Sequence, residues 1–233
     1  MQIFYSVNID GETAIFSREE SGHCLRVLRM RKGDTLSFTD GLGNIYEGVI
    51  TDDNPLSMTA AIRSMTHTLH PPYRLHVAIS PVKNDDRLEW FVEKAVETGI
   101  DEITPLICSR TEKRRIRRQR LEGLILSAMK QSVKSYLPRL NDPVSFIEFN
   151  EISRQGKRLI ACCDPGIERV LINSAFSPGD EVTILIGPEG DFTLEEISLA
   201  MKQGAIPVHL GPSRLRTETA GVLACCSVYL SNL

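Results

Sequence analysis

Two polar loops hold the residues of this chain that are best suited to do chemistry. One reads HLGPSRLRTETAG over residues 209–221 and contains Arg214, Arg216 and Glu218. The other reads GPEGDFT over residues 187–193 and contains Glu189. Carboxylates can accept a proton, and guanidinium groups can bind anionic oxygens. Glycine and proline in both loops let backbone groups approach a ligand closely. The two loops therefore predict a ligand-binding site.

Each loop follows a strand-like apolar segment, and the surrounding pattern alternates strand with helix. We expect strands at 75–80, 102–108, 158–163, 182–187 and 206–211, and helices at 85–98, 117–134, 193–203 and 219–230. Such alternation predicts an α/β domain built on a mainly parallel sheet. Ligands bind beyond the carboxyl ends of the strands in such sheets, which is where both loops lie.

The first part of the chain has a different pattern, made of short β segments. They lie at 3–7, 35–40, 45–50 and 57–65, with a short helix over 23–30 and a glycine-rich GLGN turn between the middle pair. We expect a small β-barrel over residues 1–72 and a second domain over residues 73–233, with a linker at Pro71-Pro72.

Composition narrows the class of protein. The chain has 233 residues, a formal net charge of -3 and 42% hydrophobic residues, which suffices for two domains with cores. No apolar run approaches the roughly 18 residues of a membrane span. The N-terminus lacks a secretory signal, so we expect a soluble, cytoplasmic protein. The six cysteines include no C-x-x-C and predict buried, reduced thiols.

Several common kinds of site are excluded. The chain contains no phosphate-loop motif and no G-x-G-x-x-G after a strand. His67 and His70 have the spacing of metal ligands, but they lie in a proline-rich linker and the nearby sequence offers no third ligand. No Ser-His-Asp set is apparent. We therefore expect no metal.

Two basic clusters stand out on a mildly acidic chain. The stretch RTEKRRIRRQR, over residues 110–120, has seven basic residues and one acid. A smaller cluster comprises Arg26, Arg29, Arg31 and Lys32. Such clusters are typical of phosphate binding by a patch, whereas the alternative for each is a solvated helix face.

Several motifs, in order and spacing, resemble one known family. They are SGHCLRVLRMRKGD, VEKAVETGIDEITPLICSR, KQSVKSYLP, IGPEGDFTLEE and HLGPSRLRTETAG, which together span nearly the whole chain. This set resembles the RsmE family of the SPOUT methyltransferase superfamily. Those bacterial enzymes methylate N3 of one uridine in 16S ribosomal RNA of the small subunit.

The resemblance implies a PUA-like RNA-binding barrel followed by a SPOUT domain. In SPOUT domains the C-terminal segment passes through a loop and forms a deep trefoil knot, which is an exception to the rule against threaded loops. The resemblance also implies a homodimer that uses S-adenosylmethionine and binds neither DNA nor membranes. The implied cofactor-binding residues are Leu185, Gly187, Glu189, Gly190, Leu210, Gly211, Leu215 and Thr217. The expected RNA-binding residues are Arg26, Arg29, Arg31, Arg110, Arg114, Arg115, Arg117, Arg118 and Lys134.

Arg216 and Glu218 are the candidate catalytic residues. Methylation of uracil N3 requires removal of a proton and stabilisation of the negative charge that develops on the ring oxygens. Arg216 is suited to contact a uracil oxygen or a phosphate. Glu218 could act as the base or could hold the loop through its own amides, and the residues alone leave both roles open.

The chain departs from the family pattern at three positions. Asp191 stands where the family commonly has a second glycine, and Lys130 and Lys134 stand where it often has glutamate and arginine. Lysine cannot reproduce the planar, bidentate contact of arginine. Two other functions are consistent with the sequence: a non-catalytic RNA-binding assembly factor, and a SPOUT enzyme with another target. Asn84 and Arg87 fit the N-x-x-R spacing of tRNA ribose 2′-O enzymes.

Overall fold

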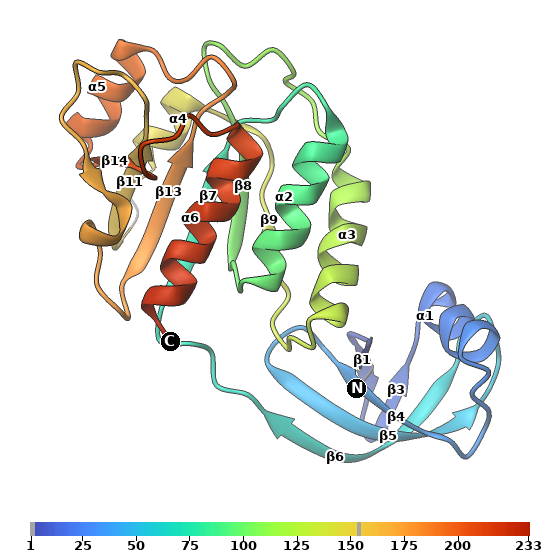
Figure 1. Cartoon of the computed structure of the whole chain (residues 1–233). Coiled ribbons are helices and arrows are strands. Elements are labelled where there is room, and N and C mark those ends of the chain that lie inside the picture. The colour runs from blue at the N-terminus through green and yellow to red at the C-terminus, as the bar shows by residue number, and fades with distance from the viewer. Residues whose placement is uncertain (1–2, 153–154) are drawn as a thin grey trace. The chain divides into compact units, whose positions relative to one another are not determined.

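The computed structural model describes residues 3–152 and 155–233, which form two compact units (Figure 1). The N-terminal unit comprises the chain up to His70 together with Leu126–Leu137. The C-terminal unit comprises Pro71–Ile125 and Pro138–Leu233. Helix α3 (Arg118–Gln131) therefore contributes its first residues to the C-terminal unit and its last residues to the N-terminal unit.

The N-terminal unit is built on one six-stranded sheet in the order β1-β4-β5-β6-β3-β2. Its elements are β1 (Ile3–Tyr5), β2 (Asn8–Asp10), β3 (Thr13–Ile15), α1 (Arg18–Gly22), a π-helical turn (His23–Val27), β4 (Thr35–Thr39), β5 (Asn44–Asp52) and β6 (Thr59–His67). Strands β1 and β4 are parallel, and the other pairs are antiparallel. The expected hairpin around GLGN is confirmed as β4–β5.

Helical structure in this unit begins earlier than predicted. The side chain of Ser17 accepts a hydrogen bond from the Glu20 amide, at 3.2 Å, and so caps the first turn of α1. The helical residues run from Arg18 and end at Val27, whereas the sequence predicted a helix over 23–30. The prediction missed the capping serine.

Glu20 and Lys130 form an ion pair within the N-terminal unit, in which the carboxylate is buried and the lysine is partly buried. The Glu20 side chain is 6% exposed, and its second oxygen accepts a hydrogen bond from the Tyr5 amide at 3.1 Å. Lys130, in α3, donates to the first oxygen. A buried carboxylate requires such partners, because burying it unpaired is strongly unfavourable. The lysine at position 130 is therefore explained by the acid that it neutralises.

The C-terminal unit confirms the predicted α/β domain on a parallel sheet. Its elements are β7 (Arg74–Ile79), α2 (Asp85–Glu97), β8 (Glu102–Ile107), the start of α3, β9 (Arg139–Leu140), β10 (Val144–Ser145), α4 (Phe146–Glu151), β11 (Lys157–Ala161), β12 (Val170–Leu171), a 3₁₀ turn (Ile172–Ser174), β13 (Glu181–Ile186), α5 (Leu194–Lys202), β14 (Ile206–His209) and α6 (Thr217–Ser231). The strand order is β10-β8-β7-β13-β11-β14-β12, and β9 also pairs with β8. Every pair in this sheet is parallel.

Helices cover both faces of the sheet (Figure 1). On one face, α4 and α5 pack over a core that includes Phe149, Leu185 and Ile197. On the other face, α6 packs on β7, β13 and α2. Gly221 permits this close approach, because a Cβ there would lie 2.7 Å from the Phe91 ring.

The predicted capping box at the start of α5 is also confirmed. Thr193 accepts a hydrogen bond from the Glu196 amide at 3.2 Å, and Glu196 accepts one from the Thr193 amide at 2.8 Å. This cap fixes the point at which the loop 187–193 becomes helix. Among the described residues, no helix is long and apolar enough to cross a membrane.

Candidate active site and cofactor pocket

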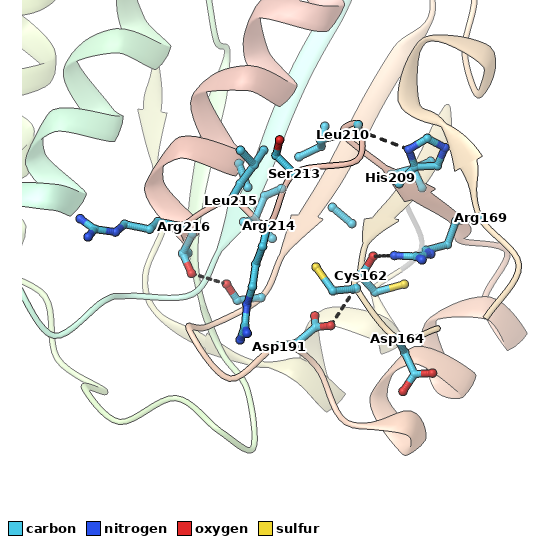
Figure 2. Close-up of a pocket in the computed structure, with 18 of the residues that line it drawn as sticks. Cys162, Asp164, Arg169, Asp191, His209, Leu210, Ser213, Arg214, Leu215 and Arg216 are labelled. Carbon is cyan, nitrogen blue, oxygen red and sulfur yellow. Dashed lines mark hydrogen bonds between the residues drawn. The ribbon is translucent and has the colours of Figure 1, made fainter. Parts of the chain in front are cut away.

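A pocket of about 1150 Å³ lies at the carboxyl ends of three neighbouring strands (Figure 2). Its wall comes from the loop after β13, from the loop after β14 that leads into α6, and from the residues that follow β11. Because β11 lies between β13 and β14 in the sheet, the ends of these three strands meet. This is the position that the sequence predicted for the ligand site.

Six of the eight expected cofactor-binding residues line this pocket: Gly187, Glu189, Leu210, Gly211, Leu215 and Thr217. Leu185 does not line the pocket, because its side chain is fully buried in the core of the sheet. Gly190 does not line it either. It packs against Arg110, whose Cδ would lie 3.3 Å from a Cβ added at Gly190.

The loop 187–193 is held from three sides by hydrogen bonds. Thr217 Oγ1, at the start of α6, donates to the Gly187 carbonyl at 3.0 Å. Arg110 Nη1, after β8, donates to the Gly190 carbonyl at 2.6 Å and to the Phe192 carbonyl at 3.3 Å. The third tie comes from Asp191, which reaches the end of β11. A loop with this many ties presents its backbone in a fixed position.

Asp191 occupies a backbone conformation that glycine usually adopts. Its φ is 61°, in the left-handed region, where aspartate and asparagine are the side chains best tolerated. Its Oδ2 accepts a hydrogen bond from the Cys163 amide at 2.7 Å, and its Oδ1 accepts one from the Phe192 amide at 2.8 Å. The departure from glycine therefore keeps the turn and adds a carboxylate to the pocket wall.

Sequence reasoning missed one wall of the pocket, which follows β11. Cys162, Cys163, Asp164, Ile167 and Arg169 all line it. Arg169 Nη1 donates to the Cys162 carbonyl at 2.8 Å and holds the segment in place (Figure 2). The strand at 158–163 was predicted, but its place beside β13 and β14 depends on the strand order, which local patterns do not contain.

The thiols in this wall correct one prediction. All six cysteines are free, but Cys163 is exposed and Cys226 is half-buried, so the expectation that all are buried is wrong for these two. Burial, followed by the charge of Asp191, raises the pKa of Cys162 to about 11 and also raises the pKa of Cys163. Both thiols therefore stay protonated and weakly nucleophilic at neutral pH.

Of the two candidate catalytic residues, Arg216 lines the pocket, whereas Glu218 does not and lies beside Arg87 of α2. The side chain of Arg216 points away from the residues around Asp191 (Figure 2). Glu218, in the first turn of α6, is 5% exposed, and its Oε1 lies 3.7 Å from Arg87 Nε of α2. Its Oε2 is buried and has no hydrogen-bond partner among the described residues. The carboxylate is thus only half satisfied.

The expected RNA-binding residues of the basic stretch differ in their surroundings. Arg117 pairs with Asp85 at 3.0 Å, and Arg118 contacts Glu122 and Asp142 at 2.8 and 2.7 Å. Arg110 holds the loop 187–193, as described above. Arg114 and Arg115 are exposed and form no ion pair with the described residues. Within the stretch, these last two have the side chains most available to a phosphate.

The remaining basic candidates belong to the N-terminal unit. Arg26 and Arg29 are exposed, and Arg31 Nη1 donates to the Leu25 and Met30 carbonyls at 3.2 and 3.1 Å. Lys134 is half-buried, and burial lowers its pKa. Of these four candidates, Arg26 and Arg29 therefore have the most accessible charges.

Comparisons with known proteins agree over nearly the full length. The family described as RNA methyltransferase domain matches residues 69–229, and the one described as RNA methyltransferase PUA domain matches residues 16–62. Ribosomal RNA small subunit methyltransferase E of Buchnera aphidicola is 25% identical over 231 residues, covering 96% of this chain and 90% of that protein.

Two solved structures show the same similarity in three dimensions. A chain from Porphyromonas gingivalis is 37% identical with a TM-score of 0.93, covering 100% of this chain and 98% of that one. Ribosomal RNA small subunit methyltransferase E from Neisseria gonorrhoeae, solved with bound S-adenosyl methionine, is 26% identical with a TM-score of 0.82, covering 97% and 96%. On its motifs, its two-unit fold and these matches, the chain belongs to the RsmE family of RNA methyltransferases.

Proposed function

We propose that this protein uses S-adenosylmethionine to methylate N3 of a specific uridine in 16S ribosomal RNA of the small subunit. The observation that carries the proposal is the pocket between the loops after β13 and β14, at the position predicted from their motifs. The relative from Neisseria gonorrhoeae, which binds S-adenosyl methionine, shares the fold over nearly the whole chain.

The residues of the pocket fit S-adenosylmethionine. The volume of about 1150 Å³ is slightly above the usual range of small-molecule sites, which is roughly 300–1,000 Å³, so the pocket has room for this ligand. Gly211 has a φ of 114°, and nothing lies within 4 Å of the position of a Cβ there, so a ligand can approach its backbone. Leu210 and Leu215 supply apolar surface for a ring, and Glu189 supplies negative charge for a cationic ligand. Gly187, Gly211 and Thr217 would hold the ligand mainly through backbone groups.

When bound, S-adenosylmethionine supplies a methyl group carried on a positively charged sulfur. The chain must supply the rest, which is chiefly positioning and a group that takes the proton from uracil N3. Arg216 and Glu218 are the residues we assign to this acceptor side. Arg216 would bind a uracil oxygen or a phosphate, which matches the direction of its side chain, away from the residues around Asp191 (Figure 2).

The half-satisfied carboxylate of Glu218 supports its assignment. A buried carboxylate oxygen without a donor is unfavourable, so such an atom often marks a place where a ligand donates. Arg87, with its Nε 3.7 Å from the other oxygen, holds Glu218 in place. Glu218 can therefore accept the proton of uracil N3, while Arg87 acts as its positioning partner.

RNA would be held by cations of both units, of which Arg26, Arg29, Arg114 and Arg115 are the exposed ones with the fewest contacts of their own. Arg114 and Arg115 supply the C-terminal contribution, with Arg117, Arg118 and Arg110 nearby in sequence but engaged in contacts of their own. In the N-terminal unit the corresponding residues are Arg26, Arg29, Arg31 and Lys134. We assign residues 1–72 to a PUA-like RNA-binding domain and residues 73–233 to the methyltransferase domain.

A homodimer and a knot complete the proposal. Helix α6 is apolar on nearly all sides, and Leu223 and Leu230 are exposed by 38% and 63%. A helix of this kind is usually buried all round, which a second copy of the chain would achieve.

After β14 the chain returns to pack on β7 and α2, and this path past the intervening strands supports a threaded last helix.

The proposal is tested by methyl transfer from labelled S-adenosylmethionine to small ribosomal subunits that lack their native modification. An N3 methyl group blocks Watson–Crick pairing and stops reverse transcriptase. We expect one new stop in 16S RNA. Label without a stop would indicate another atom, such as a ribose oxygen, and would overturn the N3 assignment. Absence of both label and cofactor binding would favour a non-catalytic assembly factor.

A further inference from the structure

We propose that Asp191 is a positioning residue that ties the loop 187–193 to the end of β11 and thereby raises the affinity of the pocket for S-adenosylmethionine. The inference rests on the proposed function for the identity of the ligand. Its structural part, the tie itself, does not depend on that identity.

The tie joins two walls of the pocket just beyond the carboxyl end of the β11 ladder. Strand β11 ends at Ala161, whose partners are Ile186 and Val208. Cys163 lies beyond the ladder, and its amide donates to Asp191 Oδ2 at 2.7 Å. Both Cys163 and Asp191 line the pocket. The Cys162 amide still donates to the Val208 carbonyl of β14, at 3.4 Å, and the Asp191 carboxylate binds the next amide along the chain.

The backbone of Asp191 is arranged to aim the carboxylate at this amide. The Asp191 amide donates to the Pro188 carbonyl at 2.9 Å and closes a tight turn. The φ of 61° at Asp191 then directs the side chain toward β11, and Oδ1 is fixed by the Phe192 amide at 2.8 Å. Hydrogen bonds from amides to a carboxylate are stronger than those between neutral groups.

The other ties of the loop act in different directions. Thr217 holds Gly187 from α6, and Arg110 holds Gly190 and Phe192 from the end of β8. Loss of Asp191 would leave those ties in place and free the β11 side. The expected effect is a looser pocket in a stably folded protein.

Glycine at position 191 separates the tie from the backbone conformation. Asp191→Gly keeps the left-handed turn, which glycine adopts without strain, but removes the carboxylate. Asp191→Asn also tolerates that conformation and keeps an oxygen that can accept one amide. The two variants thus differ in the acceptor while sharing the turn.

Three measurements on the full-length protein test the proposal: hydrogen exchange at the Cys163 amide, the Kd for S-adenosylmethionine by calorimetry, and the unfolding midpoint. For Asp191→Gly we expect faster exchange at Cys163, a Kd raised about tenfold and an unchanged or higher midpoint. Asp191→Asn should recover most of the affinity. In turnover, KM for S-adenosylmethionine should rise more than kcat falls.

If the Cys163 amide of Asp191→Gly exchanges at the wild-type rate, the proposed tie is wrong. If it exchanges faster but the Kd for S-adenosylmethionine is unchanged, the proposed effect of the tie on ligand binding is wrong. A wild-type protein that does not bind S-adenosylmethionine would overturn the proposed function and the ligand part of the inference. Exchange at Cys163 would then still decide whether the tie exists.

Discussion

The hydrogen bond between Thr217 and Gly187 gives a sharp test of how the two loops form one pocket. Thr217 is 5% exposed, and its hydroxyl donates to the Gly187 carbonyl at 3.0 Å. Thr217→Val keeps the shape of the side chain and removes the donor, which leaves a buried carbonyl unpaired. The cost of such a loss is about 1–3 kcal/mol. We expect this cost to be divided between the stability of the fold and the affinity of the pocket.

Calorimetry with S-adenosylmethionine and urea unfolding of the same preparations separate the two contributions. We expect Thr217→Val to raise the Kd about tenfold, equivalent to about 1.4 kcal/mol, with a smaller loss of stability. Thr217→Ser keeps the hydroxyl and serves as the matched control, with a Kd near that of the wild type. A Thr217→Val protein that loses more than about 1 kcal/mol of stability but keeps the wild-type Kd would refute the reasoning, because the hydrogen bond would then support only the fold.

Three further predictions concern charge and protonation. Replacing Arg114 and Arg115 together by glutamine should reduce the slope of log affinity against log salt by about 1.4 if both contact phosphates of single-stranded RNA, and an unchanged slope would make them a solvated face. Lys130→Met should destabilise the protein by about 3 kcal/mol in urea unfolding, because Glu20 is left buried without its cation, and adding Glu20→Gln should restore part of the loss. Burial raises the pKa of Cys24 from 9.0 to about 11, so the unfolded state loses this proton first and the unfolding free energy falls between these pH values. Cys162, whose pKa is also raised to about 11, contributes in the same range, so Cys24→Ala should reduce the slope by up to about 1.4 kcal/mol per pH unit without removing it; an equal slope in that variant would exclude the Cys24 thiol.

The sequence was sufficient for features that depend on neighbours along the chain. Hydrophobic periodicity predicted the strands and helices of the parallel sheet, because the side chains that face a core repeat at a fixed local spacing. Thr193 and Glu196 predicted the start of α5, since a capping box is made within one turn. The two glycine-containing loops were placed at one edge of the sheet, because parallel strands all end there.

Other features were decided by contacts between segments that lie far apart in the chain. The pocket wall after β11 depends on the strand order, which places β11 between β13 and β14. Lys130 finds a buried partner in Glu20, and Glu218 finds Arg87, through pairings that no local pattern contains. The side chain of Arg216 leaves the pocket wall in a direction that only the path of α6 sets (Figure 2).

Asp191 is a residue for which both the sequence and the tertiary structure are needed. The sequence identified it as a departure at a glycine position, and on that basis alone its effect was open. The tertiary structure supplies the reason for an acid there, because the left-handed turn brings its carboxylate to the Cys163 amide at 2.7 Å. Residue type determines which backbone conformations and hydrogen bonds are available, whereas the packing of distant strands determines which of them are made.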